Sequence, residues 1–280
     1  MERDNMLSKK ELNEIDVLKK ICEEQDNIQL KLNEDWLAMD NPDGLKIYKS
    51  YKETDLIGFM AVYGFGLTAE VCGMVHPDHR RKGMFTSFME EAAGYFNQKK
   101  YTKILLNTPA ESSSGKAFLK TLPCAYSFTE YQMKWQPVSL APSNQALVRK
   151  AKDEDKELEI RLDIEAFDTT REEAEQHWNL RKQEHGQSNY IIEHAGSGVG
   201  KLRIQRADNQ LWIYGFAILP IYQGKGIGRS ALQQVIQKQS ISQKEIHLEV
   251  QADHQHTLGL YQSCGFEVYH SQDYYRYDEG

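Results

Sequence analysis

The segment LWIYGFAILPIYQGKGIGRSA, residues 211–231, joins three structural signals. Residues 211–219 are rich in aromatic and β-branched side chains, which predicts a buried strand, and Pro220 ends it because proline lacks a backbone donor. An apolar pattern at helical spacing starts at Ile227, so a helix is predicted to begin inside the turn. The turn itself holds three alternating glycines, Gly224, Gly226 and Gly228. A tight glycine turn at the positive end of a helix favours the binding of phosphate oxygens.

Three phosphate-binding patterns compete for this turn. A Walker loop needs four residues between its first glycine and a Gly-Lys-Ser/Thr, which the turn does not provide. A dinucleotide fingerprint needs G-x-G-x-x-G with an acid about 20 positions later, and Glu245 and Glu249 match the acid only loosely. The third pattern, Gln/Arg-x-x-Gly-x-Gly/Ala after a strand, is filled by Gln223, Gly226 and Gly228.

With this third pattern in its strand-turn-helix context, the sequence resembles the GNAT superfamily of acyl-CoA-dependent N-acyltransferases. A second family signature, Asn-x-x-Ala-x-x-Leu-Tyr-x-x-x-Gly-Phe, is filled in its second half by Leu260, Tyr261, Gly265 and Phe266. His254 stands where the asparagine is usual. The resemblance implies acetyl-CoA as acyl donor and direct transfer to an amine of a small molecule or peptide in a ternary complex.

The resemblance also assigns the cofactor's parts to this half of the chain. The pyrophosphate is expected at the glycine turn, and the pantetheine arm along the backbone of the preceding strand. Lys225 and Arg229 would add charge to the backbone donors. The expected cofactor-binding residues are Ala217, Ile218, Leu219, Gln223, Gly224, Lys225, Gly226, Ile227, Gly228, Arg229 and His254.

Two residues are expected to carry the chemistry. The family's tyrosine at the position of Tyr261 protonates the departing thiolate, so Tyr261 is the expected general acid, with a packed helix residue as the alternative. The family often places a glutamate near the start of the central strand, but residues 211–214 contain no carboxylate. Glu249 is therefore the expected base and His247 the second candidate, both on the polar face of a strand predicted at residues 246–250. A salt-bridged strand face and an ordered water are the alternatives.

A second copy of the glycine turn lies in the first half of the chain, at residues 76–85. Arg80 matches Gln223 and Gly83 matches Gly226, 143 positions apart (223 minus 80). Such spacing, close to half the chain, predicts an internal repeat.

This first copy departs from the family pattern. Phe85 takes the place of Gly228, and aligning the next helices places Phe118 at the position of Tyr261. A phenyl ring cannot donate a proton, so the first half is predicted to be folded but catalytically silent. Arg80, Lys82 and Gly83 are still the expected residues for a second acyl-CoA, with the surface of a degenerate site as the alternative.

The predicted fold class is α/β, of the α+β kind, with two tandem GNAT-like domains. Each domain is expected to be a mixed, mostly antiparallel sheet flanked by helices. The predicted boundaries are residues 1–137 for a degenerate N-terminal domain, 138–145 for a linker containing proline, and 146–280 for the catalytic domain.

Composition limits the other functions. The 280 residues are 40% hydrophobic with a net charge of -7, which gives no electrostatic footprint for nucleic acid. No run of about 18 apolar residues and no signal peptide is present, so no membrane partner and a cytoplasmic location are expected. The four cysteines show no C-x-x-C pair, so no metal is expected.

Five carboxylates within residues 165–175 would favour a cationic amine as acceptor, although a solvated helical face explains them equally well. They are Glu165, Asp168, Glu172, Glu173 and Glu175. The alternative function from another class is a non-catalytic acyl-CoA-binding or interaction protein, and a dehydrogenase is a distant third. The sequence does not indicate the oligomeric state.

Overall fold

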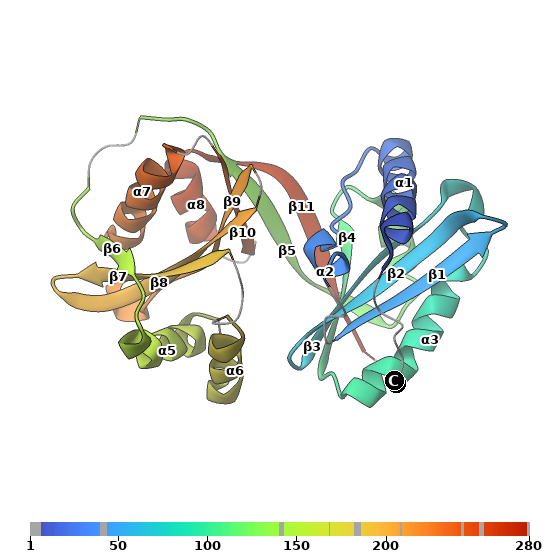
Figure 1. Ribbon diagram of the computed structural model, residues 1–280, viewed down its shortest axis with the longest axis horizontal. Coiled ribbons are helices and arrows are strands. Elements are labelled where there is room, and N and C mark those ends of the chain that lie inside the picture. Colours follow the sequence, from blue (N-terminus) through green and yellow to red (C-terminus); the bar gives the residue numbers. More distant parts are fainter. Residues whose placement is uncertain are drawn as a thin grey trace. The chain divides into compact units, whose positions relative to one another are not determined.

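The computed structural model describes residues 7–39, 44–139, 143–167, 169–181, 186–207, 209–241, 244–251 and 255–278. They form two compact units: unit 1 comprises Met1–Glu130 and His270–Gly280, and unit 2 comprises Tyr131–Tyr269. Each unit holds a mixed, mostly antiparallel sheet with helices packed on it (Figure 1). The predicted fold class is confirmed.

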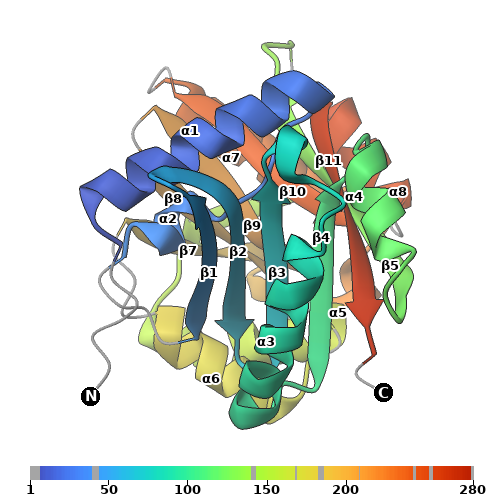
Figure 2. The ribbon, with the colours of Figure 1, turned by 90° about the vertical axis from the view of Figure 1, so that its right-hand side faces the viewer.

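In unit 1, three antiparallel strands lead into a parallel pair. These strands are β1 (Leu45–Lys52), β2 (Asp55–Phe65), β3 (Thr68–Val75) and β4 (Lys103–Pro109), with β4 parallel to β3. The helices are α1 (Lys9–Asp26), α2 (Glu34–Leu37), η1 (Pro77–His79), α3 (Met84–Lys99) and α4 (Ser113–Leu119). Figure 2 shows α3 lying against the face of this sheet that is turned toward the viewer.

In the sequence, Leu12, Ile15, Leu18 and Ile21 repeat at three-residue steps and predict a helix at the start of the chain. This helix is α1, but its buried stripe differs from the prediction. Ile15, Leu18 and Cys22 pack into the core, whereas Ile21 is 37% exposed. A helix has 3.6 residues per turn, so a pattern repeated every three residues rotates off the buried face after two turns, and the four-residue step brings Cys22 inward.

In unit 2, the strand order is β5-β10-β9-β8-β7-β6. The strands are β5 (Cys124–Trp135), β6 (Leu147–Lys150), β7 (Gln187–His194), β8 (Ser197–Ala207), β9 (Gln210–Ile218) and β10 (Glu245–Gln251). The helices are η2 (Asp153–Asp155), α5 (Lys156–Phe167), α6 (Arg171–Arg181), η3 (Pro220–Tyr222), α7 (Ile227–Ser240) and α8 (Gln255–Ser263). In Figure 1, α7 and α8 cover one face of this sheet, and α5 and α6 lie on the other.

The predicted domain boundaries differ from the two compact units. The last strand is β11 (Phe266–Tyr277), and its residues from His270 onward belong to unit 1. There Gln272–Tyr277 pair antiparallel with Ile104–Pro109 of β4. Unit 1 therefore combines two segments distant in sequence, a long-range pairing that local patterns do not reveal. Of the predicted linker, residues 140–142 lie outside the described residues.

Among the described helices, none combines the length and the apolar character that crossing a membrane requires.

Candidate active site

The glycine turn of unit 2 leaves the first turn of a helix open. Gly224 and Gly226 have positive φ angles of 72° and 76°, and Gly226 is the N-cap of α7 without a side-chain capping bond. A Cβ atom added at either glycine would meet nothing within 4 Å. The backbone N–H groups at the start of α7 are thus left without a side-chain cap, an arrangement that favours an anion.

The turn of unit 1 has the same backbone conformation. Gly83, with φ at 79°, is the N-cap of α3 and also has no side-chain capping bond. Arg81 takes the place of Gly224 and adopts a φ of 59°, in the left-handed region that a non-glycine residue rarely enters. Two different sequences therefore build one turn geometry.

The residues that open the two motifs brace their turns. Gln223 Nε2 donates to the Ile218 carbonyl at 2.9 Å, and Arg80 Nε donates to the Val75 carbonyl at 3.0 Å. The Arg80 guanidinium also forms two 2.9 Å bonds to Asp26. These bonds give both side chains a structural role in their turns, and their direct contact with a cofactor stays a prediction.

The two flanking lysines are also engaged. Lys82 Nζ donates to the Asp78 carbonyl at 2.8 Å, and Lys225 Nζ lies 5.3 Å from the centre of the Tyr222 ring. Arg229 is exposed on the first turn of α7.

A fork opens beside each turn, where two parallel strands stop pairing. In unit 2 the ladder between β9 and β10 ends at Ile213 and Leu248, and in unit 1 the ladder between β3 and β4 ends at Val71 and Leu106. Beyond these pairs the strands continue, to Ile218 and Gln251 in unit 2 and to Val75 and Pro109 in unit 1. Ala217–Leu219, the predicted arm-binding residues, lie along the unit 2 fork.

The fork of unit 2 has an irregularity that the fork of unit 1 lacks. Between β8 and β9, Lys201 pairs with Ala217 but Arg203 pairs with Tyr214, so β9 holds one extra residue. Gly215, with φ at 55°, lies in this β-bulge. The ladder between β2 and β3 keeps a constant register throughout. Bulges beside active sites re-aim side chains.

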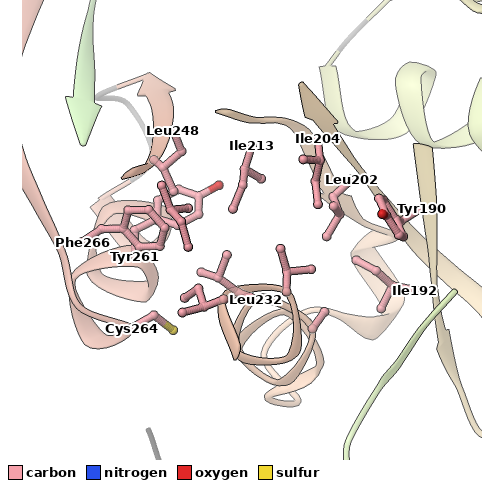
Figure 3. Packing of buried hydrophobic residues seen from close by; sticks show 14 of the residues in the cluster. Tyr190, Ile192, Leu202, Ile204, Ile213, Leu232, Leu248, Tyr261, Cys264 and Phe266 are labelled. Carbon is pink, nitrogen blue, oxygen red and sulfur yellow. The ribbon is translucent and has the colours of Figure 1, made fainter. Parts of the chain in front are cut away.

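Tyr261 lies on the α7 side of the unit 2 fork. The residue is 5% exposed, and its ring contacts those of Phe216 and Phe266, with centroids 6.2 and 6.1 Å away. Figure 3 shows its hydroxyl on the side that faces Ile213 and Leu248, the last pair of the ladder. Burial raises the pKa of Tyr261 well above its usual range, so the phenol stays protonated at neutral pH.

The structural equivalent of Tyr261 in unit 1 is Leu119, one residue from the predicted Phe118. Helices α4 and α8 begin 142 positions apart (255 minus 113), as do the strands that follow them. Leu119 and Tyr261 are both buried, and Phe118 is partly buried like Leu260. The prediction that unit 1 has no proton donor here is unaffected, because leucine has none either.

Glu249 is the first residue of β10 after the ladder ends. Successive strand residues point to opposite faces, so its side chain lies on the face opposite Leu248 and the Tyr261 core. Its Oε1 accepts a hydrogen bond of 2.9 Å from Gln132 Nε2 on β5. The residue at the same position in unit 1 is Asn107.

His247 is buried, whereas alternation predicted it on the polar face of the strand. It is 3% exposed, stacks on Trp212 with a centroid distance of 4.8 Å, and pairs through Nε2 with Glu245 at 3.3 Å. Burial lowers its pKa, which keeps the imidazole neutral. The large indole over the ring explains why alternation alone misplaced this residue.

The unit 1 fork contains a cavity of about 670 Å³ that sequence reasoning missed. Its lining includes Phe85 and Phe118 on the α3 side of the sheet, and Cys22 and Met74 on the α1 side. The cavity therefore passes through the fork from one face of the sheet to the other. The glycine turn predicted from the sequence marks one end of the cavity. The opposite wall comes from residues after α1, which belong to no sequence motif.

Two of the five carboxylates in the predicted acidic cluster are ion-paired, and a third caps a helix. Glu165 pairs with Arg161 at 2.6 Å, Glu175 pairs with Arg171 at 3.0 Å, and Glu173 accepts the N–H of Thr170. These bonds fit a solvated helical face. Glu172 is exposed, and Asp168 and His254 lie outside the described residues. The described residues hold no cluster of three or more His, Cys, Asp or Glu suited to a metal ion.

Residues 147–266 match the model of the Acetyltransferase (GNAT) family. No curated protein matches the sequence.

Solved structures resemble the chain over nearly all of its length. A GCN5-related N-acetyltransferase from Sphaerobacter thermophilus is 18% identical with a TM-score of 0.77, covering 98% of this chain and 95% of that one. A tandem GNAT protein from the clavulanic acid biosynthesis pathway is 14% identical with a TM-score of 0.68, covering 96% and 95%. An acetyltransferase of the GNAT family from Colwellia psychrerythraea is 12% identical with a TM-score of 0.62, covering 95% and 97%. At these identities the likeness is one of fold.

Proposed function

We propose that the chain is an acyl-CoA-dependent N-acyltransferase that transfers acetyl from acetyl-CoA to an amine, with transfer in unit 2. One observation carries the proposal: a phenol, Tyr261, and a carboxylate, Glu249, flank one fork on opposite faces of the sheet, beside a helix N-terminus that is open to an anion. The family match over residues 147–266 supports this assignment.

The residues of unit 2 would have different roles in binding the donor and transferring protons, according to where they lie. The first backbone N–H groups of α7 would hold the pyrophosphate, and the unpaired edge of β9 beyond Ile213 would hold the arm. An aliphatic amine is protonated at neutral pH, so it arrives as a cation and must lose a proton before it attacks. Glu249 would accept that proton, and Tyr261 would donate one to the departing thiolate.

Unit 1 would bind the same kind of donor without transferring its acyl group. It has the same turn and fork, but Asn107 stands in the place of Glu249 and Leu119 in the place of Tyr261. An amide cannot accept the amine's proton, and leucine cannot supply one. This division separates our proposal from the alternative of a non-catalytic binding protein, in which neither unit would turn over.

Thiol release tests the proposal when the full chain is mixed with acetyl-CoA and a panel of small and peptide amines. The matched variants Gly226→Asp and Gly226→Asn are nearly isosteric, and both residue types tolerate a positive φ. Only the aspartate repels the pyrophosphate, so Gly226→Asp should lose turnover while Gly226→Asn retains most of it. Equal rates in the two variants, or no thiol release with any amine, would contradict the assignment.

A further inference from the structure

The unit 1 cavity continues beyond the fork into a pocket whose walls are apolar or sulfur-bearing. We call it the acyl chamber and define it by six residues on the α1 side of the sheet. They are Cys22, Ile28, Leu30, Leu32, Cys72 and Met74. We propose that unit 1 binds an acyl-CoA whose acyl chain is longer than acetyl and lies in this chamber. This inference rests on the proposed function, in that the forks bind acyl-CoA.

The other mouth of the cavity suits the polar end of such a ligand. Arg81, Gly83 and Met84 line it, and the uncapped start of α3 presents backbone N–H groups there. The cavity thus offers an anion-binding end at this mouth and an apolar end beyond the fork. An acyl-CoA has the same order, with its phosphates at one end and its acyl chain at the other.

The charged groups near the chamber already have partners. Asp26 accepts from Arg80 and, at 3.0 Å, from Ser114, and Lys31 donates to Glu130 at 2.6 Å. The Cys22 thiol donates to the Val75 carbonyl at 3.5 Å. A cationic amine would thus meet carboxylates that are already bonded, whereas an apolar chain loses only water.

One residue of the lining carries a buried polar atom without a partner in the described part of the chain. Asn107 Nδ2 is buried and has no hydrogen-bond partner among the described residues, although an amide N–H normally finds one. Asn107 is the first residue of β4 past the fork, where a thioester or arm carbonyl would pass. The geometry points to Asn107 Nδ2 as the donor to that carbonyl.

The binding test uses the full chain carrying Gly226→Asp, so that calorimetry reports unit 1. Burial of about two methylene groups is enough for a tenfold gain in affinity, so octanoyl-CoA should bind at least about tenfold more tightly than acetyl-CoA. Adding Gly83→Asp should abolish both, whereas Gly83→Asn should not. Affinities that agree within about twofold would overturn the inference.

A second set of variants separates the chamber from the rest of the site. Leu30→Trp fills the chamber, so it should remove the octanoyl preference and leave the acetyl-CoA affinity within about twofold; Ile28→Trp serves the same purpose if the first variant does not fold. Asn107→Leu should weaken both ligands about tenfold. An octanoyl preference that survives both tryptophans would overturn the inference. If acetyl-CoA binding depends on Gly226 but no acyl-CoA binding depends on Gly83, only this inference fails. If the wild-type chain binds neither acetyl-CoA nor octanoyl-CoA, the proposed function fails too.

Discussion

Phe85 lies against Gly73 in unit 1, and this contact inverts the one between Gly228 and Phe216 in unit 2. A Cβ atom added to Gly73 would lie 2.8 Å from Phe85 Cε2, and one added to Gly228 would lie 3.5 Å from Phe216 Cζ. In each unit one phenyl ring fills the space between central strand and helix N-terminus, supplied by the helix in unit 1 and by the strand in unit 2. The unusual phenylalanine of the first motif is thus compensated one strand away.

Gly228→Phe should destabilise unit 2, because a second ring would collide with Phe216 and overpacked cores lose about 1–3 kcal/mol. The double variant Gly228→Phe/Phe216→Gly copies the unit 1 arrangement and should recover most of that loss. Urea unfolding midpoints measure both. Gly228→Ala is the control, since a single methyl group meets only ordinary contacts there. Losses that simply add in the double variant would show that the two sites are independent.

Tyr261→Phe keeps the ring among Phe216 and Phe266 and removes only the hydroxyl. Proton donation is lost, so kcat should fall about 10²-fold, the low end for general acid–base groups, because coenzyme A is a fairly good leaving group. Acetyl-CoA affinity and the melting temperature should stay nearly constant. A kcat within about twofold of wild type would assign the proton to water or another residue and leave Tyr261 a packing role.

Glu249→Gln retains an oxygen for the hydrogen bond from Gln132 but cannot accept a proton. At pH 7 kcat should fall at least about 10²-fold. The deficit should narrow as the pH rises toward the pKa of the amine, because more acceptor is then already deprotonated. Steady-state rates from pH 7 to 9.5 test this, with Tyr261→Phe as the contrast because its deficit should not narrow in the same way. A uniform deficit at every pH would argue for a role of Glu249 other than base.

His247 should make unit 2 less stable in mild acid. Burial depresses its pKa below the ordinary value of about 6.5, so below that pH the unfolded chain binds the proton more tightly. The stability is present at neutral pH and is lost as the pH falls through 6.5. The facing Glu245 opposes the depression and Lys134 adds to it, but burial dominates.

The comparison of urea midpoints at pH 7.5 and 5.5 with those of His247→Phe isolates this residue. Phenylalanine keeps the stacking on Trp212 and does not titrate, so the variant should lose less stability in acid than wild type. His270, whose pKa is also lowered, is present in both proteins and cancels. An identical acid loss in the two proteins would mean that His247 does not carry the effect.

The sequence predicted the parts of this fold that local patterns specify. Both glycine turns and the helices after them are where periodicity and glycine spacing place them. The four-residue edge strand β6 was missed because it is too short to show alternation. The bulge did leave a sign, since an isolated glycine such as Gly215 inside a strand pattern suggests one.

The candidate site was predicted unevenly for physical reasons. The glycine turns repeat 143 positions apart, whereas the closing helices α4 and α8 repeat 142 positions apart. The bulge in β9 adds one residue before the turn of unit 2, and a shorter segment between that turn and β10 removes it again. A single alignment offset therefore placed Phe118 opposite Tyr261. The acyl chamber needs Leu30 and Met74 side by side, a tertiary contact without a local signature.

The pairing of Gln272–Tyr277 with β4 has a consequence for synthesis of the protein. Domains generally fold as they leave the ribosome, the N-terminal one first. Here the strand beside β4 is translated after all of unit 2, so unit 1 must wait with an open sheet edge while unit 2 emerges and folds. Such an edge readily pairs with other chains. Nascent unit 1 is thus the stage at which we expect chaperones to be needed most, although its residues are made first.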